Sequence, residues 1–309
     1  MILTVTLNAS VDKLYLIDQL RPHQVMRVRE VHNTAGGKGL NVSRVAALAG
    51  ERVTAMGFVG GHNGALFESL ITEENIKKYF THVQSETRCC INVRDRETNQ
   101  STEFLEPGNP VTPQEVQQFL ADYEAQLPHA DVVTISGSMP KGVPVDFYGE
   151  LVKLARRYEK PVLLDSSGDA LKNALSAGPT MIKPNADEIR QLLQVDIHSR
   201  DDVIAAARQL HQKGIALVAV SLGKDGVLVV SEEGVYHGIT PDIPVVNTVG
   251  CGDSMVAGFA VTMARGEPLK EQIHYAVAVS TANALTKETG FFHREDLAEL
   301  LRQVRVEQL

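Results

Sequence analysis

Asp131-Val132-Val133-Thr134-Ile135 is a short apolar run that lacks the polar–apolar alternation of a half-exposed strand. Strands buried on both faces of a parallel sheet have this composition. The run that begins at Asp131 continues to residue 136. Similar runs occupy residues 2–7, 53–59, 161–165, 179–183 and 215–221. Helical patterns lie between and after them, at 40–49, 63–73, 112–127, 145–158, 185–194, 200–213, 252–265 and 269–286. This alternation predicts an α/β fold with a doubly wound, mostly parallel sheet.

Residues 12–33 and 87–105 break this rhythm. Both stretches are β-prone and partly alternating, as in Arg88-Cys89-Cys90-Ile91-Asn92-Val93, and no helix separates either from its next strand-like run. They predict a small antiparallel β lid on one edge of a single domain that spans residues 1–309. The exposed edge of such a lid needs a cover.

Composition and charge argue against several classes of partner. The chain has 309 residues, 43% of them hydrophobic, and a net charge of −8 without a basic run. Nucleic acid is not an expected partner, because binding it requires a basic face. The three cysteines form no disulfide framework, which fits a reducing cytoplasm. We see neither a signal peptide nor a bilayer-spanning stretch, so we expect no membrane association.

The segment Gly250-Cys251-Gly252-Asp253 places a turn of small residues at the start of a predicted helix. Glycines let backbone N–H groups approach an anion closely, and a helix N-terminus adds unpaired donors. Such a turn can hold the charge that develops on a transferring phosphoryl group, while Asp253 accepts a proton from an incoming hydroxyl. Taken alone, the segment is explained equally well by Asp253 acting as a helix cap.

A second glycine turn, Gly36-Gly37-Lys38-Gly39, precedes the apolar helix at 40–49. An ammonium group among backbone donors suits a phosphate better than a neutral sugar. The alternative is a tight turn with a solvated Lys38. Asp12 follows the first strand, where it could accept hydrogen bonds from sugar hydroxyls or be an ordinary turn residue.

The two glycine turns and the residues around them are similar to the sequence signatures of a known family. Asn247-Thr248-Val249-Gly250-Cys251-Gly252-Asp253 and Gly36-Gly37-Lys38-Gly39-Leu40-Asn41-Val42-Ser43 resemble the two signatures of the ribokinase-like, PfkB-type carbohydrate kinases. The signatures lie far apart in the chain, and with the motifs between them the resemblance covers essentially the whole sequence. It implies a ribokinase-like fold. It also implies that Asp253 is the catalytic base and that Gly250, Cys251 and Gly252 form the anion hole.

The resemblance also implies an acceptor site. In that family the residues that match Asp12 and Asn41 bind sugar hydroxyls, and Arg88 matches an arginine that holds the phosphate of a hexose phosphate. Arg27 is a candidate for extra charge across a dimer interface, although a solvated surface arginine fits equally well. The full set of substrate candidates is Asp12, Arg27, Gly37, Lys38, Gly39, Asn41, Arg88 and Ser138.

The nucleotide side is expected where Lys183-Pro184-Asn185-Ala186-Asp187-Glu188 ends a strand and begins a helix. Asn185 and Glu188 share a helix face. They match the Asn-x-x-Glu motif that organises Mg²⁺, water and phosphate in the resembling kinases, but a cap with a first-turn Glu fits as well. The segment 221–226 is likewise either an ATP contact or a hairpin turn. Resemblance gives the nucleotide candidates Lys183, Asn185, Ser221, Gly223, Gly226 and Asn283.

The function implied is phosphoryl transfer from MgATP to a ketohexose phosphate, in the branch of 1-phosphofructokinase and tagatose-6-phosphate kinase. Fructose 1-phosphate, giving fructose 1,6-bisphosphate, is the first expected acceptor, and tagatose 6-phosphate, giving tagatose 1,6-bisphosphate, is the second. Lys38 and Arg88 argue against a neutral-sugar kinase. Asp253 with its glycine turn argues against an inactive sugar-phosphate sensor. The resembling kinases often pair their lids, so we expect a homodimer.

Cys251 is expected at a helix N-terminus beside bound phosphate. That position can lower the pKa of a thiol and raise its reactivity. The sequence therefore predicts that alkylation of Cys251 inactivates the enzyme and that ATP slows the alkylation.

Overall fold

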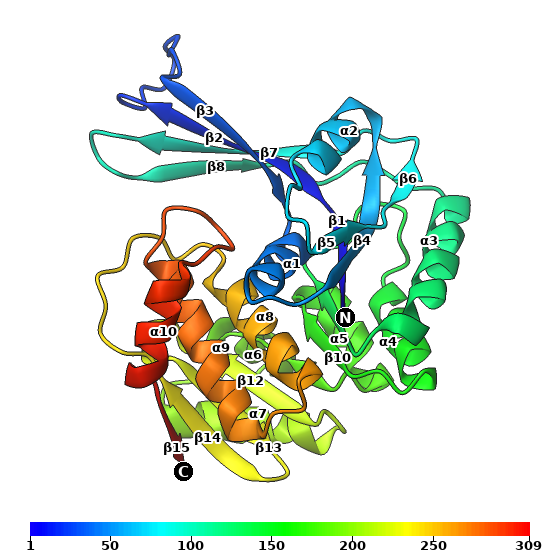
Figure 1. The fold of residues 1–309 in the computed structure, drawn as a ribbon, viewed down its shortest axis with the longest axis vertical. Helices are drawn as coiled ribbons and strands as arrows, with labels where there is room; N and C mark the ends of the chain where they lie inside the picture. The colour runs from blue at the N-terminus through cyan, green and yellow to red at the C-terminus, as the bar shows by residue number, and fades with distance from the viewer.

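The computed structural model describes residues 1–309 as two sheets with helices around the larger one (Figure 1). The strands of the larger sheet are β1 (Ile2–Asn8), β4 (Val53–Gly60), β5 (Ile76–Lys78), β6 (Thr81–Val83), β9 (Val132–Ser136), β10 (Val162–Asp165), β11 (Met181–Ile182), β12 (Leu217–Ser221), β13 (Val227–Ser231), β14 (Gly234–Ile239) and β15 (Arg305–Gln308).

The larger sheet is parallel through its centre. Its order is β15-β14-β13-β12-β11-β10-β9-β1-β4-β5, with β6 also paired to β4. Every pair from β12 to β5 is parallel, and β13, β14 and β15 extend one edge in antiparallel fashion. All six predicted strand runs lie in the parallel part, which confirms the predicted fold class.

Helices cover both faces of this sheet. Successive strand residues point to opposite faces, so Val162 and Leu164 pack into one core and Leu163 into the other. The helices on the face of Leu163 are α1 (Lys38–Leu48), α2 (Gly61–Ser69), α8 (Cys251–Ala264), α9 (Leu269–Ala284) and α10 (Arg294–Gln303). Those on the opposite face are α3 (Pro113–Gln126), α4 (Phe147–Arg157), α5 (Gly168–Ala174), α6 (Ala186–Leu193) and α7 (Arg200–Gln212).

Three short 3-10 helices complete the set, at Leu127–His129, Leu175–Ala177 and Gly223–Asp225. None of the helices combines the length and the hydropathy needed to cross a bilayer.

The carboxyl ends of β1, β9, β10, β11 and β12 meet at one edge of the sheet, because these strands are parallel. In open α/β sheets, ligands bind outside this edge.

The smaller sheet is the predicted lid and projects from that end of the molecule (Figure 1). It runs β3 (Glu30–Gly36), β2 (Ser10–Ile17), β7 (Arg88–Asp95) and β8 (Ser101–Leu105). The outer pairs are antiparallel, as predicted, whereas the central pair β2–β7 is parallel. The reason lies in the larger sheet, where β1 and β6 are both parallel to β4. Since β2 continues from β1 and β7 follows β6, both strands enter the lid in the same direction.

Candidate active site

The glycine turn before α8 leaves backbone donors open. Gly250 caps α8 at φ 83°, without a side-chain cap, and no acceptor is bonded to the N–H groups of Gly252 and Asp253. A Cβ on Gly250 would lie 2.8 Å from Thr289 Cγ2 and 2.9 Å from the backbone nitrogen of Gly290, so space as well as φ demands glycine. Free N–H groups at a helix N-terminus attract an anion.

Asp253 lies in the first turn of α8 and is buried. Its Oδ2 accepts a hydrogen bond of 2.8 Å from Asn41 Nδ2. Burial, and then the charge of Asp165, raise the pKa of Asp253 to about 6, against the opposing effects of Asn41, Lys38 and Lys183. A carboxylate with this pKa is mostly ionised at neutral pH, yet it is basic enough to take a proton from a hydroxyl group.

Two lysines flank Asp165, a buried residue at the carboxyl end of β10. Lys38 Nζ lies 3.7 Å from Asp165 Oδ2, and Lys183 Nζ lies 3.5 Å from Oδ1. The charge of Asp165 raises the pKa of Lys38 against the opposing effect of burial, with further help from Asp253 and Glu188. A Cβ on Gly252 would be 3.2 Å from Lys183 Nζ. Both ammonium groups therefore lie close to the N-terminus of α8, where they favour an anion.

The root of the lid brings Asp12 and Arg88 onto one face. In the pairing of β2 with β7, Ser10 lies beside Arg88 and Asp12 lies beside Cys90. The side chains of Asp12 and Arg88 therefore project from the same face of the lid. Ser10 Oγ donates to Asp12 Oδ1 at 2.6 Å. Burial raises the pKa of Asp12, against the effects of Ser10, Arg88 and Arg44. A Cβ on Gly36 would overlap the Asp12 carboxylate, which therefore lies against the first glycine turn.

Arg88 and Ser138 meet around Asn8, at the end of β1. Arg88 donates to the Asn8 carbonyl oxygen through Nε at 3.2 Å and Nη2 at 3.0 Å, and to the Glu106 carbonyl oxygen through Nη1 at 2.7 Å. Asn8 Nδ2 donates to Ser138 Oγ at 3.0 Å. These contacts orient the half-exposed guanidinium group toward the same edge of the sheet as Lys38.

Asn185 and Glu188 form a reciprocal cap at the start of α6. Glu188 N donates to Asn185 Oδ1, and Asn185 N donates to Glu188 Oε2, each at 2.9 Å. Asn185 also bridges Ser221 at the end of β12. A surface hollow of about 680 Å³ is lined by Asn185, Ser221 and the start of α7, but not by Asp253 or Lys38. No group of three or more His, Cys, Asp or Glu side chains could hold a metal ion by itself.

Comparison with known proteins agrees with this geometry. Residues 3–295 match the pfkB family of carbohydrate kinases. The chain belongs to this family. A curated relative, a tagatose-6-phosphate kinase from Staphylococcus epidermidis, is 38% identical over 99% of both chains.

Solved structures place the fold among the same kinases. Phosphofructokinase-2 from Escherichia coli, in complex with potassium, superposes with a TM-score of 0.91 and 30% identity over 98% of both chains. A possible 1-phosphofructokinase from Thermotoga maritima gives a TM-score of 0.89 and 28% identity, over 100% of this chain and 99% of that one. Ribokinase from the same organism, at 20% identity, shares the fold with a TM-score of 0.78, which confirms the ribokinase-like architecture.

The positions of Arg27 and Asn283 in this pfkB-family kinase bear on their expected roles. Arg27 is exposed in the connection between β2 and β3, and Figure 1 shows this connection at the outer end of the lid. Asn283 is fully buried, and its amide is engaged by Val249, Cys251, Gly290 and Phe291. Asn283 therefore braces the glycine turn through both ends of its amide.

The expected activation of Cys251 is not found. Burial raises the pKa of its thiol, the Asn283 hydrogen bond opposes this rise, and the charge of Asp253 adds to it. Burial and a neighbouring carboxylate both disfavour a thiolate.

Asp165 and Arg44 were missed by the sequence-based prediction. The signal for Asp165 was a carboxylate that directly ends a buried strand, Leu163-Leu164-Asp165, between two strands with predicted site residues at their ends. Arg44 gave no such signal, since a single arginine on a helix is usually solvated.

Proposed function

We propose that this kinase transfers the γ-phosphoryl group of ATP to a free primary hydroxyl group of a ketohexose phosphate. The observation that carries the proposal is the meeting of Asp253, the glycine turn, Lys38 and Lys183 at one helix N-terminus. Arg88 adds a cation beside Asp12, on the lid face of the site. A neutral sugar carries no negative charge that Lys38 and Arg88 could bind.

In this mechanism the acceptor hydroxyl group gives its proton to Asp253 as its oxygen attacks the γ-phosphorus. The bond from that phosphorus to the β–γ bridging oxygen breaks, and ADP leaves. The N–H groups of Gly252 and Asp253, together with Lys183, stabilise the charge on the transferring group. Asp12 and Asn41 hold sugar hydroxyl groups, and Lys38 and Arg88 hold the phosphate that the sugar already carries. Ser221, Gly223 and Gly226 contribute to the ATP side.

Magnesium fits this site without a dedicated cage. Both carboxylate oxygens of Asp165 are buried and accept no hydrogen bond, and Glu188 lies near enough to raise the pKa of Lys38. Magnesium commonly binds through one or two carboxylates, waters and substrate phosphates, so Asp165 and Glu188 are the residues that would hold it. When bound, the ion neutralises charge on the phosphate oxygens.

Two acceptors fit the proposal. The name of the Staphylococcus epidermidis relative, at 38% identity, favours tagatose 6-phosphate, which we place first. The Thermotoga maritima neighbour, at 28% identity, supports fructose 1-phosphate, the first choice from sequence. Both sugars carry a phosphate at one end and a free primary hydroxyl group at the other, so the same charged groups can serve either.

We further propose a homodimer that pairs the lids, each lid being part of a single domain that spans the chain. The lid face opposite Asp12 carries an apolar stripe across neighbouring strands, made of Tyr15, Val31, Ile91, Val93 and Phe104. Val31 is 53% exposed and Phe104 is 58% exposed, and a second copy of the chain would cover both side chains.

The three free cysteines agree with a reaction in the reducing cytoplasm.

The test is a coupled ADP-release assay with MgATP and four acceptors: tagatose 6-phosphate, fructose 1-phosphate, fructose 6-phosphate and ribose. We expect the highest kcat/KM with one of the first two. A preference for ribose would contradict the roles of Lys38 and Arg88. Absence of turnover with all four, in a folded protein that binds ATP, would contradict the proposal as a whole.

A further inference from the structure

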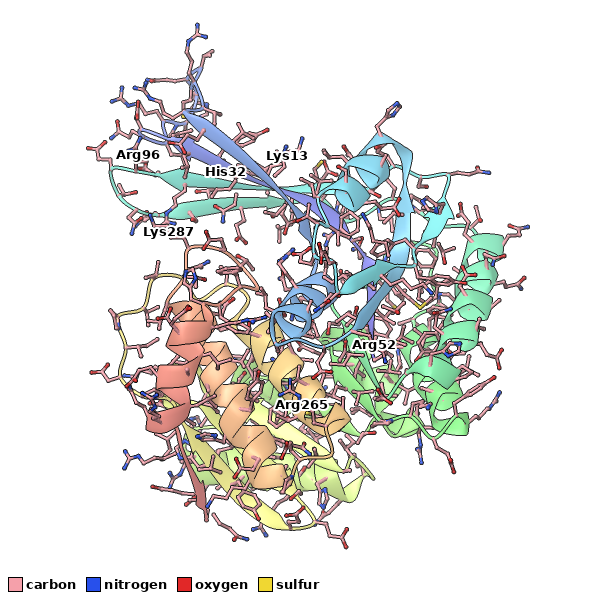
Figure 2. The ribbon with its side chains drawn as sticks, viewed as in Figure 1. Lys13, His32, Arg52, Arg96, Arg265 and Lys287 are labelled. Carbon is pink, nitrogen blue, oxygen red and sulfur yellow. The ribbon has the colours of Figure 1, made fainter.

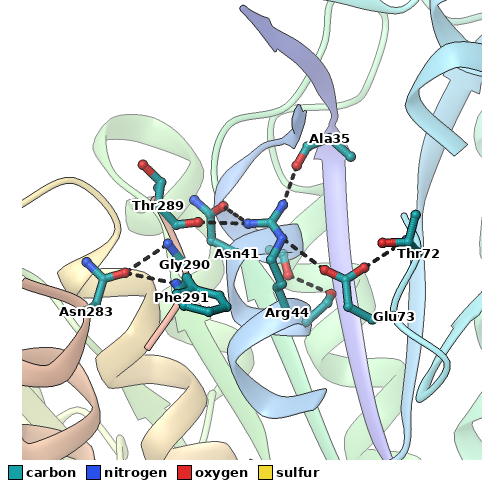
Figure 3. A network of polar contacts seen from close by, with 11 residues as sticks. Ala35, Asn41, Arg44, Thr72, Glu73, Asn283, Thr289, Gly290 and Phe291 are labelled. Carbon is teal, nitrogen blue, oxygen red and sulfur yellow. Dashed lines mark hydrogen bonds and ion pairs between the residues drawn. The ribbon is translucent and has the colours of Figure 1, made fainter. Parts of the chain in front are cut away.

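Arg44 is a partly buried arginine of α1 that no step of the proposed mechanism uses. Its side chain is 17% exposed. Nη2 donates to the Ala35 carbonyl oxygen at 2.6 Å, and Nη1 donates to the Thr289 carbonyl oxygen at 2.9 Å and to Asn41 Oδ1 at 3.1 Å. Nε lies 3.4 Å from Glu73 Oε1 (Figure 3). A single guanidinium group thus joins the lid strand β3, the loop before α10, helix α1 and the segment before β5.

The bond from Arg44 to Asn41 determines which end of the Asn41 amide faces Asp253. An amide has one accepting oxygen and one donating nitrogen. Because Arg44 is only a donor, it holds Asn41 Oδ1, which leaves Nδ2 to donate to Asp253 Oδ2 at 2.8 Å. If the amide flipped, its oxygen would face the Asp253 carboxylate and no hydrogen bond could form.

A second route leads from Arg44 to the glycine turn. Thr289 precedes Gly290, whose N–H donates to Asn283 Oδ1 at 2.8 Å. Asn283 Nδ2 in turn donates to the Val249 carbonyl oxygen at 2.9 Å. The fit is close, because a Cβ on Gly290 would lie 2.9 Å from Asn41 Cβ and 3.1 Å from Arg44 Nη1. Figure 3 shows Arg44, Asn41, Thr289, Gly290 and Asn283 as one continuous network.

We propose that Arg44 is a positioning residue of the phosphoryl-transfer site. It holds the Asn41 amide in the orientation that donates to Asp253, and it ties the loop at 289–291 to the glycine turn. Since Ala35 lies in β3 beside its last residue, Gly36, the same guanidinium group connects the root of the lid to the catalytic base. The inference rests on the proposed role of Asp253 as the catalytic base.

The variants Arg44→Met and Arg44→Lys test this proposal. Methionine keeps the apolar stem and removes the donors, and a misplaced reacting group costs about 100-fold in kcat. We expect a loss of that size with little change in the KM for ATP. Lysine keeps the charge but lacks the planar fork that reaches several acceptors at once, so it restores only part of the activity. Full activity of Arg44→Lys would show that charge alone suffices and would overturn the proposal.

Arg265 provides a matched control. It lies at the other end of α8, where Nε meets Glu51 Oε1 at 2.8 Å and Nη2 donates to the Ala49 carbonyl oxygen at 3.0 Å (Figure 2). Arg265→Met therefore removes another guanidinium group that is held by a glutamate and a backbone carbonyl oxygen, here between the C-terminal end of α8 and the residues just after α1. We expect it to affect thermal stability but not kcat. An equal loss of kcat in both methionine variants would show that Arg44 has only a structural role and would overturn the proposal.

A titration of Asp253 tests the proposal without any substrate. The charged groups that face Asp253 are Lys38 and Arg44 from α1, Asp165 from β10 and Lys183 after β11. Strands β1 and β9 contain no titratable residue, and those of α9 lie in its first two turns, away from Asn283. Loss of Arg44 removes a nearby cation and frees the Asn41 amide. Both changes move the Asp253 midpoint to higher pH.

The midpoint is measured by carbon-13 NMR of aspartate-labelled protein, and the Asp253 signal is identified by its absence in Asp253→Asn. An upward shift in Arg44→Met, and none in Arg265→Met, supports the proposal even if no ketohexose phosphate is turned over. An unchanged midpoint together with unchanged kcat overturns it. Inactivity of the unmodified enzyme with every acceptor would instead count against the proposed function.

Discussion

The substitution Asp253→Asn should lower turnover while it preserves the fold. The asparagine is nearly isosteric with the aspartate, and its Oδ1 can still accept from Asn41, but it cannot take a proton from a hydroxyl group. General-base catalysis contributes about 10²- to 10⁴-fold. We therefore expect kcat in the coupled ADP-release assay to fall by about 10³-fold, while the fold is retained.

The same substitution should stabilise the protein, and the structure gives the size of the effect. Burial raises the pKa of Asp253 from 3.8 to about 6. A shift of about two units, at about 1.4 kcal/mol per unit, corresponds to roughly 3 kcal/mol. Because the folded-state pKa is the higher one, the folded protein binds the proton more tightly than the unfolded chain. The penalty is therefore full above pH 6 and absent below pH 3.8.

Urea unfolding of both proteins between pH 4.5 and pH 8 measures this difference. We expect the stability advantage of Asp253→Asn to grow as pH rises from 4.5 to about 6 and then to level off. Asp296→Asn, in the first turn of α10, is the control for the loss of a helix-terminal carboxylate. Near-normal turnover of Asp253→Asn would refute the assignment of the base. A stability difference that does not change with pH would refute the raised pKa.

Three further predictions follow from the same geometry. The kcat/KM of the unmodified enzyme should fall about tenfold per pH unit below about pH 6; a plateau that extends below pH 5 would contradict this. Arg88→Ala should raise the KM for the sugar phosphate and leave the KM for ATP unchanged, and an effect on ATP alone would move Arg88 to the other side of the site. Inactivation by iodoacetamide at Cys251 should be slow at pH 7, accelerate beyond pH 9 and be slowed by ATP, because burial raises the pKa of the thiol. An inactivation rate that levels off below pH 8 would show a lowered pKa instead.

Local patterns predicted most of the fold. Strands buried on both faces leave apolar runs without alternation, and these runs marked β1, β4, β9, β10, β11 and β12. The parallel pairing of β2 with β7 could not be read in this way, because it depends on where β1 and β6 leave the larger sheet. Two helices were not predicted: α5 has only 7 residues, and α10 is short and rich in charge.

The candidate site divides along a similar line. Residues adjacent in sequence, such as Gly250 to Asp253, could be recognised because the turn and the carboxylate are one local unit. The role of Asp165 could not be predicted from its neighbours in sequence, because it depends on Lys38 and Lys183, which lie on either side of it only in the folded chain. Burial was the other missing quantity. It could not be judged for Cys251 from sequence, and it reverses the expected direction of the thiol pKa.

The most direct test of the central claim is a crystal structure with a non-hydrolysable ATP analogue and the preferred ketohexose phosphate. The decisive quantity is the distance from the free primary hydroxyl oxygen of the sugar to the nearer carboxylate oxygen of Asp253. We predict about 3 Å, the hydrogen-bond reach of a general base, with the sugar phosphate held by Lys38 and Arg88. A sugar bound in the opposite direction, or a hydroxyl group out of reach of Asp253, would contradict the account.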